Sequence, residues 1–181
     1  KGAVKPVHTS YFVNSESEKR VIEAEKELFV PVSRIDDLLD WKVEGKGIDL
    51  IKTLQILDIE EVYYSDLDTI IEDLFDLYQT GGSVGIKQLQ AYTRTLKFKR
   101  VPENEAEEVM NKLNKKADDK LIRKYQDIMI FKLLEKANKL GWPFQIHTGM
   151  ANLPDSNPVL LNNLFNQFSD VDFVLLHCYP Y

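Results

Sequence analysis

Three polar side chains that could take part in chemistry lie in or just after short apolar segments. Lys87 lies in SVGIKQLQAY, His147 ends PFQIH, and His177 follows the apolar run FVLL. Neutral imidazoles that project into one cavity suit a divalent transition metal, whereas an ammonium group has no lone pair to offer a metal. The histidines therefore indicate a metal site, and Lys87 does not fit such a site as an ordinary ammonium group.

Hydrophobic periodicity places these residues on strands that alternate with helices. We predict strands in KELFVPVSRID (26–36), SVGIKQLQAY (83–92), FQIH (144–147) and DFVLLHCYPY (172–181). Capping residues and apolar residues three and four positions apart predict helices over 15–27, 65–82, 118–141 and 158–168, with a shorter helix through 103–113. Strands and helices in alternation are typical of parallel strands with crossover helices. The predicted fold class is therefore α/β.

The predicted strands would bring the candidate residues to one edge of the sheet. Lys87, His147 and His177 each lie toward the C-terminal end of a predicted strand. In parallel α/β sheets and barrels, the loops that bind ligands gather at this edge. The histidines lie 30 residues apart, about one strand and one helix, so we expect them on neighbouring strands at similar height.

Four segments resemble consecutive blocks of one known family. GIKQLQAYTRTL, PFQIHTGM, NPVLLNNLF and FVLLHCYPY, in this order over residues 83–181, resemble the amidohydrolase-related family, often labelled amidohydrolase 2. Its members are metal-dependent (β/α)₈ barrels. The first 80 residues resemble the family only in their rhythm of strands and helices. The resemblance implies a partial (β/α)₈ TIM-type barrel with parallel strands and crossover helices.

The resemblance also implies a set of metal ligands. By position, Lys87 corresponds to the family's ligand on the fourth strand, His147 to that on the fifth and His177 to that on the sixth. The family's lysine can be carbamylated, which turns a cation into a carboxylate that bridges two metals. The implied cofactor is a divalent metal, zinc or manganese, with carbamylated Lys87.

The resemblance further implies residues that face the substrate. Tyr92, Tyr179 and Tyr181 would lie just beyond the strand ends, and Arg94 would join them. In relatives an arginine usually follows the AY pair directly, whereas Thr93 stands there in this chain and Arg94 comes one place later. For the tyrosines, packing against the rim of the sheet is an alternative role.

Other ligands of the family do not occur in these 181 residues. The sequence has no His-x-His and no later strand-end aspartate of the family pattern, and we interpret its remaining histidine, His8, as a surface or loop residue. A complete barrel needs about 250 residues. We therefore expect one truncated barrel domain over residues 1–181, corresponding to about strands 3 to 6, with little activity alone. Association into a homo-oligomer would cover its open edges.

These observations support a leading function and three alternatives. The leading function is a piece of a metal-dependent hydrolase that acts on a small ester, lactone, amide or carboxylic acid. A decarboxylase or sugar-acid isomerase of the same superfamily is one alternative. An inactive remnant that serves as an oligomeric or partner-binding module is another. The last is an unrelated α/β binding protein with structural histidines.

Composition restricts the partners and the location of the protein. The net charge of −6 and the pI near 5.2 argue against a nucleic-acid partner, which would require a basic surface. No stretch reaches the roughly 18 apolar residues of a membrane span, so we expect no membrane partner and a cytoplasmic location. Cys178 is the only cysteine, so no internal disulfide can form.

Overall fold

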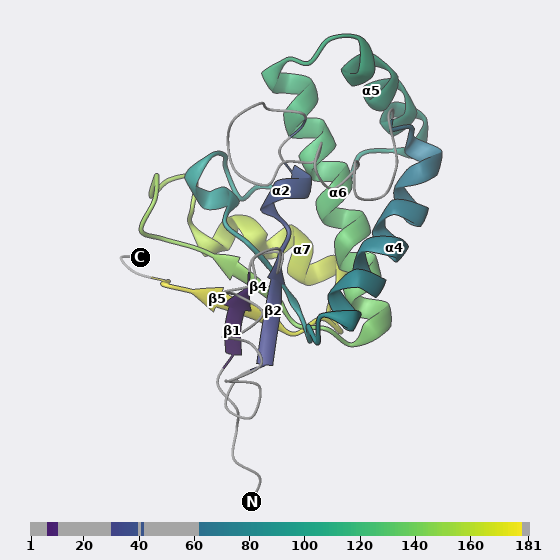
Figure 1. The fold of residues 1–181 in the computed structure, drawn as a ribbon. Coiled ribbons are helices and arrows are strands. Elements are labelled where there is room, and N and C mark those ends of the chain that lie inside the picture. The colour runs from purple at the N-terminus through teal and green to yellow at the C-terminus, as the bar shows by residue number, and fades with distance from the viewer. Residues whose placement is uncertain (1–6, 11–29, 40, 42–61, 179–181) are drawn as a thin grey trace, which may run out of the picture.

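The computed structural model describes residues 7–10, 30–39, 41 and 62–178, and from residue 30 onward its strands alternate with helices (Figure 1). The strands are β1 (Val7–Ser10), β2 (Val30–Arg34), β3 (Ile86–Gln88), β4 (Phe144–His147) and β5 (Phe173–Leu176). The α-helices are α2 (Asp36–Leu39), α4 (Leu67–Thr80), α5 (Glu103–Lys115), α6 (Asp119–Leu140) and α7 (Asn162–Gln167). Short 3₁₀ helices are η1 (Tyr64–Asp66), η2 (Gln90–Tyr92) and η3 (Pro158–Leu161).

The strands form one parallel sheet in the order β1-β2-β3-β4-β5. The predicted parallel α/β arrangement is thus confirmed for the described residues. The sheet holds one strand more than predicted, because VHTS forms β1 and pairs with β2. His8, which we interpreted as a surface or loop residue, does not lie in a loop, since its backbone lies in β1 opposite Pro31.

The long helices follow the apolar periodicity closely. In α4 the residues that repeat every three or four positions are buried, from Leu67 to Tyr78. The α6 helix begins where the side chain of Asp118 accepts a hydrogen bond from the backbone N–H of Leu121. It ends at Gly141, whose φ of 63° is a left-handed conformation that glycine adopts without steric cost. The predicted helix over 15–27 lies outside the described residues.

Several elements differ from the prediction in length, among them the last strand, predicted over 172–181 and formed over Phe173–Leu176. The segment 83–92 forms only a short strand, β3, because the chain turns at residues 89–92 into η2. Side chains hold this turn: Asp36 Oδ1 accepts from the N–H of Leu89 at 2.6 Å, and Gln88 Oε1 accepts from the N–H of Gln90 at 2.6 Å. The predicted helix over 158–168 begins as η3 and continues as α7.

The sheet has one apolar face and one more polar face. Ile86, Phe144 and Ile146 are fully buried in the same core as the side chains of α4 and α6. In Figure 1, α4, α5 and α6 lie together on one side of the strands. Because side chains alternate along a strand, Lys87 and His147 lie on the opposite face, the one that would form the interior of a barrel.

None of the described helices combines the length and the apolar character that a membrane crossing requires.

Candidate metal site

His147 is the last residue of β4 and is 3% exposed. Its Nε2 atom is buried and has no hydrogen-bond partner, so the ring's bond with the backbone of Gly149 must come from Nδ1. Burial lowers the pKa of His147, and the nearby His177 and Lys87 lower it further. His147 is therefore a neutral imidazole whose Nδ1 carries the proton and whose Nε2 presents a bare lone pair.

His177 follows β5 and turns its ring toward His147. The register pairs His147 with Leu176, so an extended residue 177 would point to the other face of the sheet. His177 instead has a φ of 71°, and its ring centroid lies 4.5 Å from that of His147. A left-handed conformation costs a non-glycine residue about 1 to 2 kcal/mol. The strained backbone conformation of His177 is thus the one that brings its ring against the ring of His147.

Lys87 lies on the same face of the sheet as His147. In the register of the sheet, Lys87 lies opposite Gln145 on β4 and opposite Arg34 on β2. Gln145 is two residues before His147, so the two share a face of the sheet. Gly85 lets β3 approach β4 closely, because a Cβ there would lie 2.9 Å from the carbonyl oxygen of Pro143. Burial lowers the pKa of Lys87, Arg34 lowers it further, and the Asp36 carboxylate opposes both effects.

Arg34 and Asp36 border this site, and sequence reasoning did not select them. Asp36 accepts hydrogen bonds from the N–H of Leu89 on Oδ1 and from Arg34 Nε at 3.1 Å on Oδ2. Burial raises the pKa of Asp36 despite these donors. The carboxylate thereby joins the end of β2 to the turn after β3, within electrostatic reach of Lys87. The available signal was the SRIDD sequence, in which two charged residues end a predicted strand.

Arg94 lies elsewhere, against α6. Its guanidinium donates to Asp127 Oδ1 at 2.7 Å, to Gln126 Oε1 and to the carbonyl oxygens of Thr95 and Arg123. The same group lies over the ring of Phe98, 4.6 Å from its centroid. None of these contacts involves either histidine of the site. They give the predicted substrate role of Arg94 no support.

The predicted tyrosines divide into one that the structure describes and two that it does not. Tyr92, in η2, is 59% exposed, and its ring centroid lies 4.5 Å from that of His147. Tyr179 and Tyr181 lie outside the described residues. Tyr92 is therefore the described tyrosine that borders the histidines.

The two histidines supply part of the ligand set that a transition metal requires. His147 offers a buried, unpartnered Nε2, and the ring of His177 lies beside it. Within the described part of the chain, no group of three or more His, Cys, Asp or Glu side chains gathers closely enough to hold a metal ion. Two imidazoles are present, and among the described residues a third ligand would have to be of another residue type, such as Lys87 after carbamylation.

Fold and site together define a partial parallel α/β barrel with histidines at the C-terminal ends of two neighbouring strands. The model of the amidohydrolase family, Amidohydro_2, matches residues 99–180. The matched part of the chain contains both histidines and is similar to the amidohydrolase family. The curated protein fluG from Emericella nidulans is 40% identical over 73 residues, which are 38% of this chain and 8% of fluG.

Solved structures confirm the fold class. Uronate isomerase from Thermotoga maritima is similar over 93% of this chain, with a TM-score of 0.68 and 16% identity. Glucuronate isomerase from Caulobacter crescentus is similar over 94%, with a TM-score of 0.70 and 13% identity. At such low identity the likeness shows the fold alone. The chain spans 42% and 40% of the length of these two proteins.

Proposed function

We propose that this chain carries the divalent-metal site of a metal-dependent hydrolase, with His147 and His177 as ligands. Carbamylated Lys87 is the proposed third ligand, and zinc or manganese the proposed metal. The family match over residues 99–180 supports the class of protein.

The observation that carries the proposal is the bare Nε2 of His147. A buried polar atom without a partner costs about 1 to 3 kcal/mol, and native proteins contain few of them. This atom belongs to a neutral imidazole, its proton is held on Nδ1 by the backbone of Gly149, and the ring of His177 lies next to it. A bound cation would satisfy the lone pair, and the bond to Gly149 would keep the ring oriented.

A bound metal would supply a water of lowered pKa and would polarise a carbonyl oxygen. The residues of the chain would hold the metal and orient its ligands. His147 would present Nε2, and Tyr92 would fix the imidazole plane through its ring contact. The Asp36 carboxylate would fix the turn after β3. The proposed substrate is a small ester, lactone, amide or carboxylic acid.

We expect these 181 residues alone to hydrolyse such substrates little or not at all. The family's His-x-His and its strand-end aspartate, which handles a proton in that chemistry, are not among them. The assay uses the purified chain with added zinc or manganese and esters, lactones and amides as substrates. Turnover above buffer that disappears in a His147→Ala variant would overturn the expected inactivity and support the metal site.

A second candidate function is that of a remnant that binds a partner or another copy of itself. The lack of a third His, Cys, Asp or Glu beside the two histidines, among the residues that the structure describes, favours it. Metal content separates the two candidates. Stoichiometric metal in the purified chain, with a melting temperature that falls on chelation, supports the metal site. Metal-free protein whose melting temperature is unchanged by chelator supports the remnant.

A further inference from the structure

Exposed apolar side chains flank the two histidines. Tyr92 is 59% exposed and lies against the ring of His147, while Met150, three residues after His147, is 64% exposed. Leu153, in the same loop, is 39% exposed. Single exposed apolar residues are common on proteins. Tyr92, Met150 and Leu153, which we call the apolar wall, differ because they come from the two loops that leave the strand ends at the candidate site.

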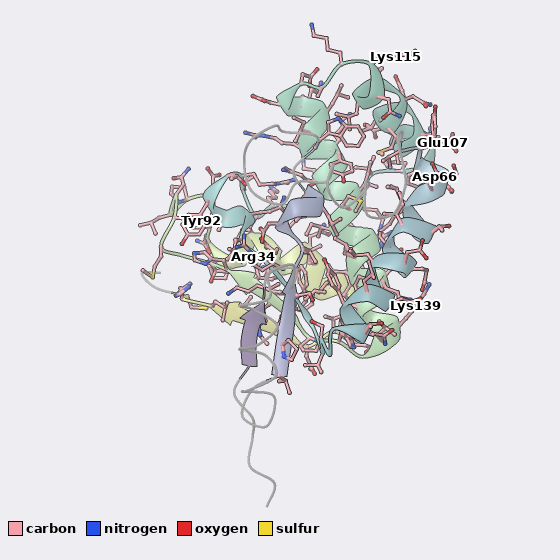
Figure 2. All side chains as sticks on the ribbon, in the orientation of Figure 1. Arg34, Asp66, Tyr92, Glu107, Lys115 and Lys139 are labelled. Atoms are coloured by element: carbon pink, nitrogen blue, oxygen red, sulfur yellow. The ribbon has the colours of Figure 1, made fainter. Side chains whose placement is uncertain are left out.

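Backbone hydrogen bonds hold these two loops in place. The loop after β4 is closed by the N–H of Gly149, which donates to the carbonyl oxygen of Ser156 at 3.1 Å. The loop after β3 is joined to it, because the N–H of Leu96 donates to the carbonyl oxygen of Asp155 at 2.8 Å. The apolar wall is therefore built on segments that are tied to each other. Figure 2 shows Tyr92 at the side of the molecule toward which β4 and β5 run.

Met150 is exposed in spite of two costs. Its φ of 47° is a left-handed conformation, which methionine rarely adopts, and its long apolar side chain meets water. A thioether and a phenol ring are both well suited to contact an aromatic ring. The neighbouring imidazole of His147, whose ring lies against that of Tyr92, adds a further planar surface.

We propose that the substrate of this site carries an aromatic group that packs between Tyr92 and Met150 while its reacting group faces His147 and His177. This inference rests on the proposed function, because it names the substrate class of the same site. The site should therefore bind aromatic esters, lactones, amides or acids in preference to their short aliphatic counterparts. The contact with the apolar wall itself requires no metal.

The test uses the metal-free chain with ¹³C-labelled methionine methyl groups. The sequence has three methionines, of which Met110 and Met129 are buried, at 0% and 1% exposure, and Met150 is exposed. Benzamide and acetamide, which share the amide and differ in the ring, are titrated while the methyl resonances are recorded. We expect benzamide to shift the Met150 methyl and to bind roughly three- to tenfold more tightly than acetamide, as an aromatic contact allows. The methyls of Met110 and Met129 serve as internal controls that should not move.

Variants locate the contact. Tyr92→Leu keeps apolar bulk without the ring and should bring the two amides to equal affinity, whereas Tyr92→Phe should keep the preference. Val159→Ala, at an equally exposed apolar residue in η3, is the matched control and should change nothing. Unchanged Met110 and Met129 resonances show that each variant is folded. Equal affinity of the two amides for the unmodified chain, or a preference that survives Tyr92→Leu, would overturn the inference.

A final arm separates this inference from the proposed function. Zinc is added to the unmodified chain and its binding is measured alone. If zinc does not bind but benzamide still shifts Met150, the proposed function fails and the aromatic contact stands. If zinc binds but the two amides bind equally, the metal site stands and the aromatic substrate class is wrong.

Discussion

Two clusters of ionisable side chains near the ends of β3 and β4 differ greatly in how many of their polar atoms have hydrogen-bond partners. Arg94, which follows β3, donates to four acceptors and forms an ion pair with Asp127 at 2.7 Å. His147, which ends β4, keeps a buried Nε2 that has no partner. Both residues were predicted to belong to the site. The difference teaches that the residue whose bonds are complete stabilises the fold, whereas the residue left incomplete is the better candidate for function.

The largest expected effect concerns the satisfied cluster. Burial lowers the pKa of Arg94 and raises that of Asp127, and the attraction between them opposes both shifts. Arg94→Met would leave Asp127 buried without its partner, so we expect the free energy of unfolding to fall by about 3 to 5 kcal/mol. Urea denaturation measures this loss.

The double variant Arg94→Met, Asp127→Leu is the control for this experiment. It removes both charges and should recover much of the lost stability, because no uncompensated charge remains. Zinc affinity should be unchanged in both variants at temperatures where they are folded. A folded Arg94→Met chain that lost zinc binding but kept its stability would contradict the claim that Arg94 stabilises the fold and His147 forms the site.

A smaller effect is expected at His177, where the backbone is left-handed. His177→Gly and His177→Ala both remove the imidazole, but only glycine adopts this conformation without strain. We expect the glycine variant to be more stable than the alanine variant by about 1 kcal/mol, measured by thermal denaturation. The reverse order is expected for Lys139→Gly against Lys139→Ala in the last turn of α6, where glycine is the poorer residue. Equal stability of the two His177 variants would argue against strain at this position.

The smallest effect is expected for an exposed ion pair. Lys112 and Glu108 lie four residues apart on α5, and their side chains are 57% and 62% exposed. Solvent screening makes such pairs weak, so Lys112→Ala should lower the free energy of unfolding, measured by urea denaturation, far less than Arg94→Met does. A loss comparable to that of Arg94→Met would mean that burial does not explain the difference between the pairs.

Local patterns predicted the helices and the positions of the two histidines at strand ends. The apolar repeat and the caps placed α4 and α6 to within a few residues, because these signals lie within the helices themselves. The position of His147 at a strand end followed from the short apolar segment before it. These features depend on interactions between residues that are close in sequence.

Features that depend on distant contacts were not predicted. Arg94 meets Asp127 only because α6 packs against the turn after β3. The role of Asp36 depends on a bond to Leu89, 53 positions away. The direction of His177 depends on a positive φ, which the sequence signals clearly only when the residue is glycine. The strand at residues 7–10 is so short that its pattern carries little information.

The central claim is that the bare Nε2 of His147 binds a metal together with His177. The most direct measurement is a zinc titration of the purified chain, competed against a chromogenic chelator, beside His147→Leu and the control Lys112→Ala. We predict stoichiometric zinc binding by the unmodified chain and by Lys112→Ala, and an affinity more than about 100-fold lower for His147→Leu, since loss of a mere outer-shell partner already costs 10- to 100-fold. Equal zinc affinity in the unmodified chain and His147→Leu, or no zinc binding by the unmodified chain, would contradict the claim.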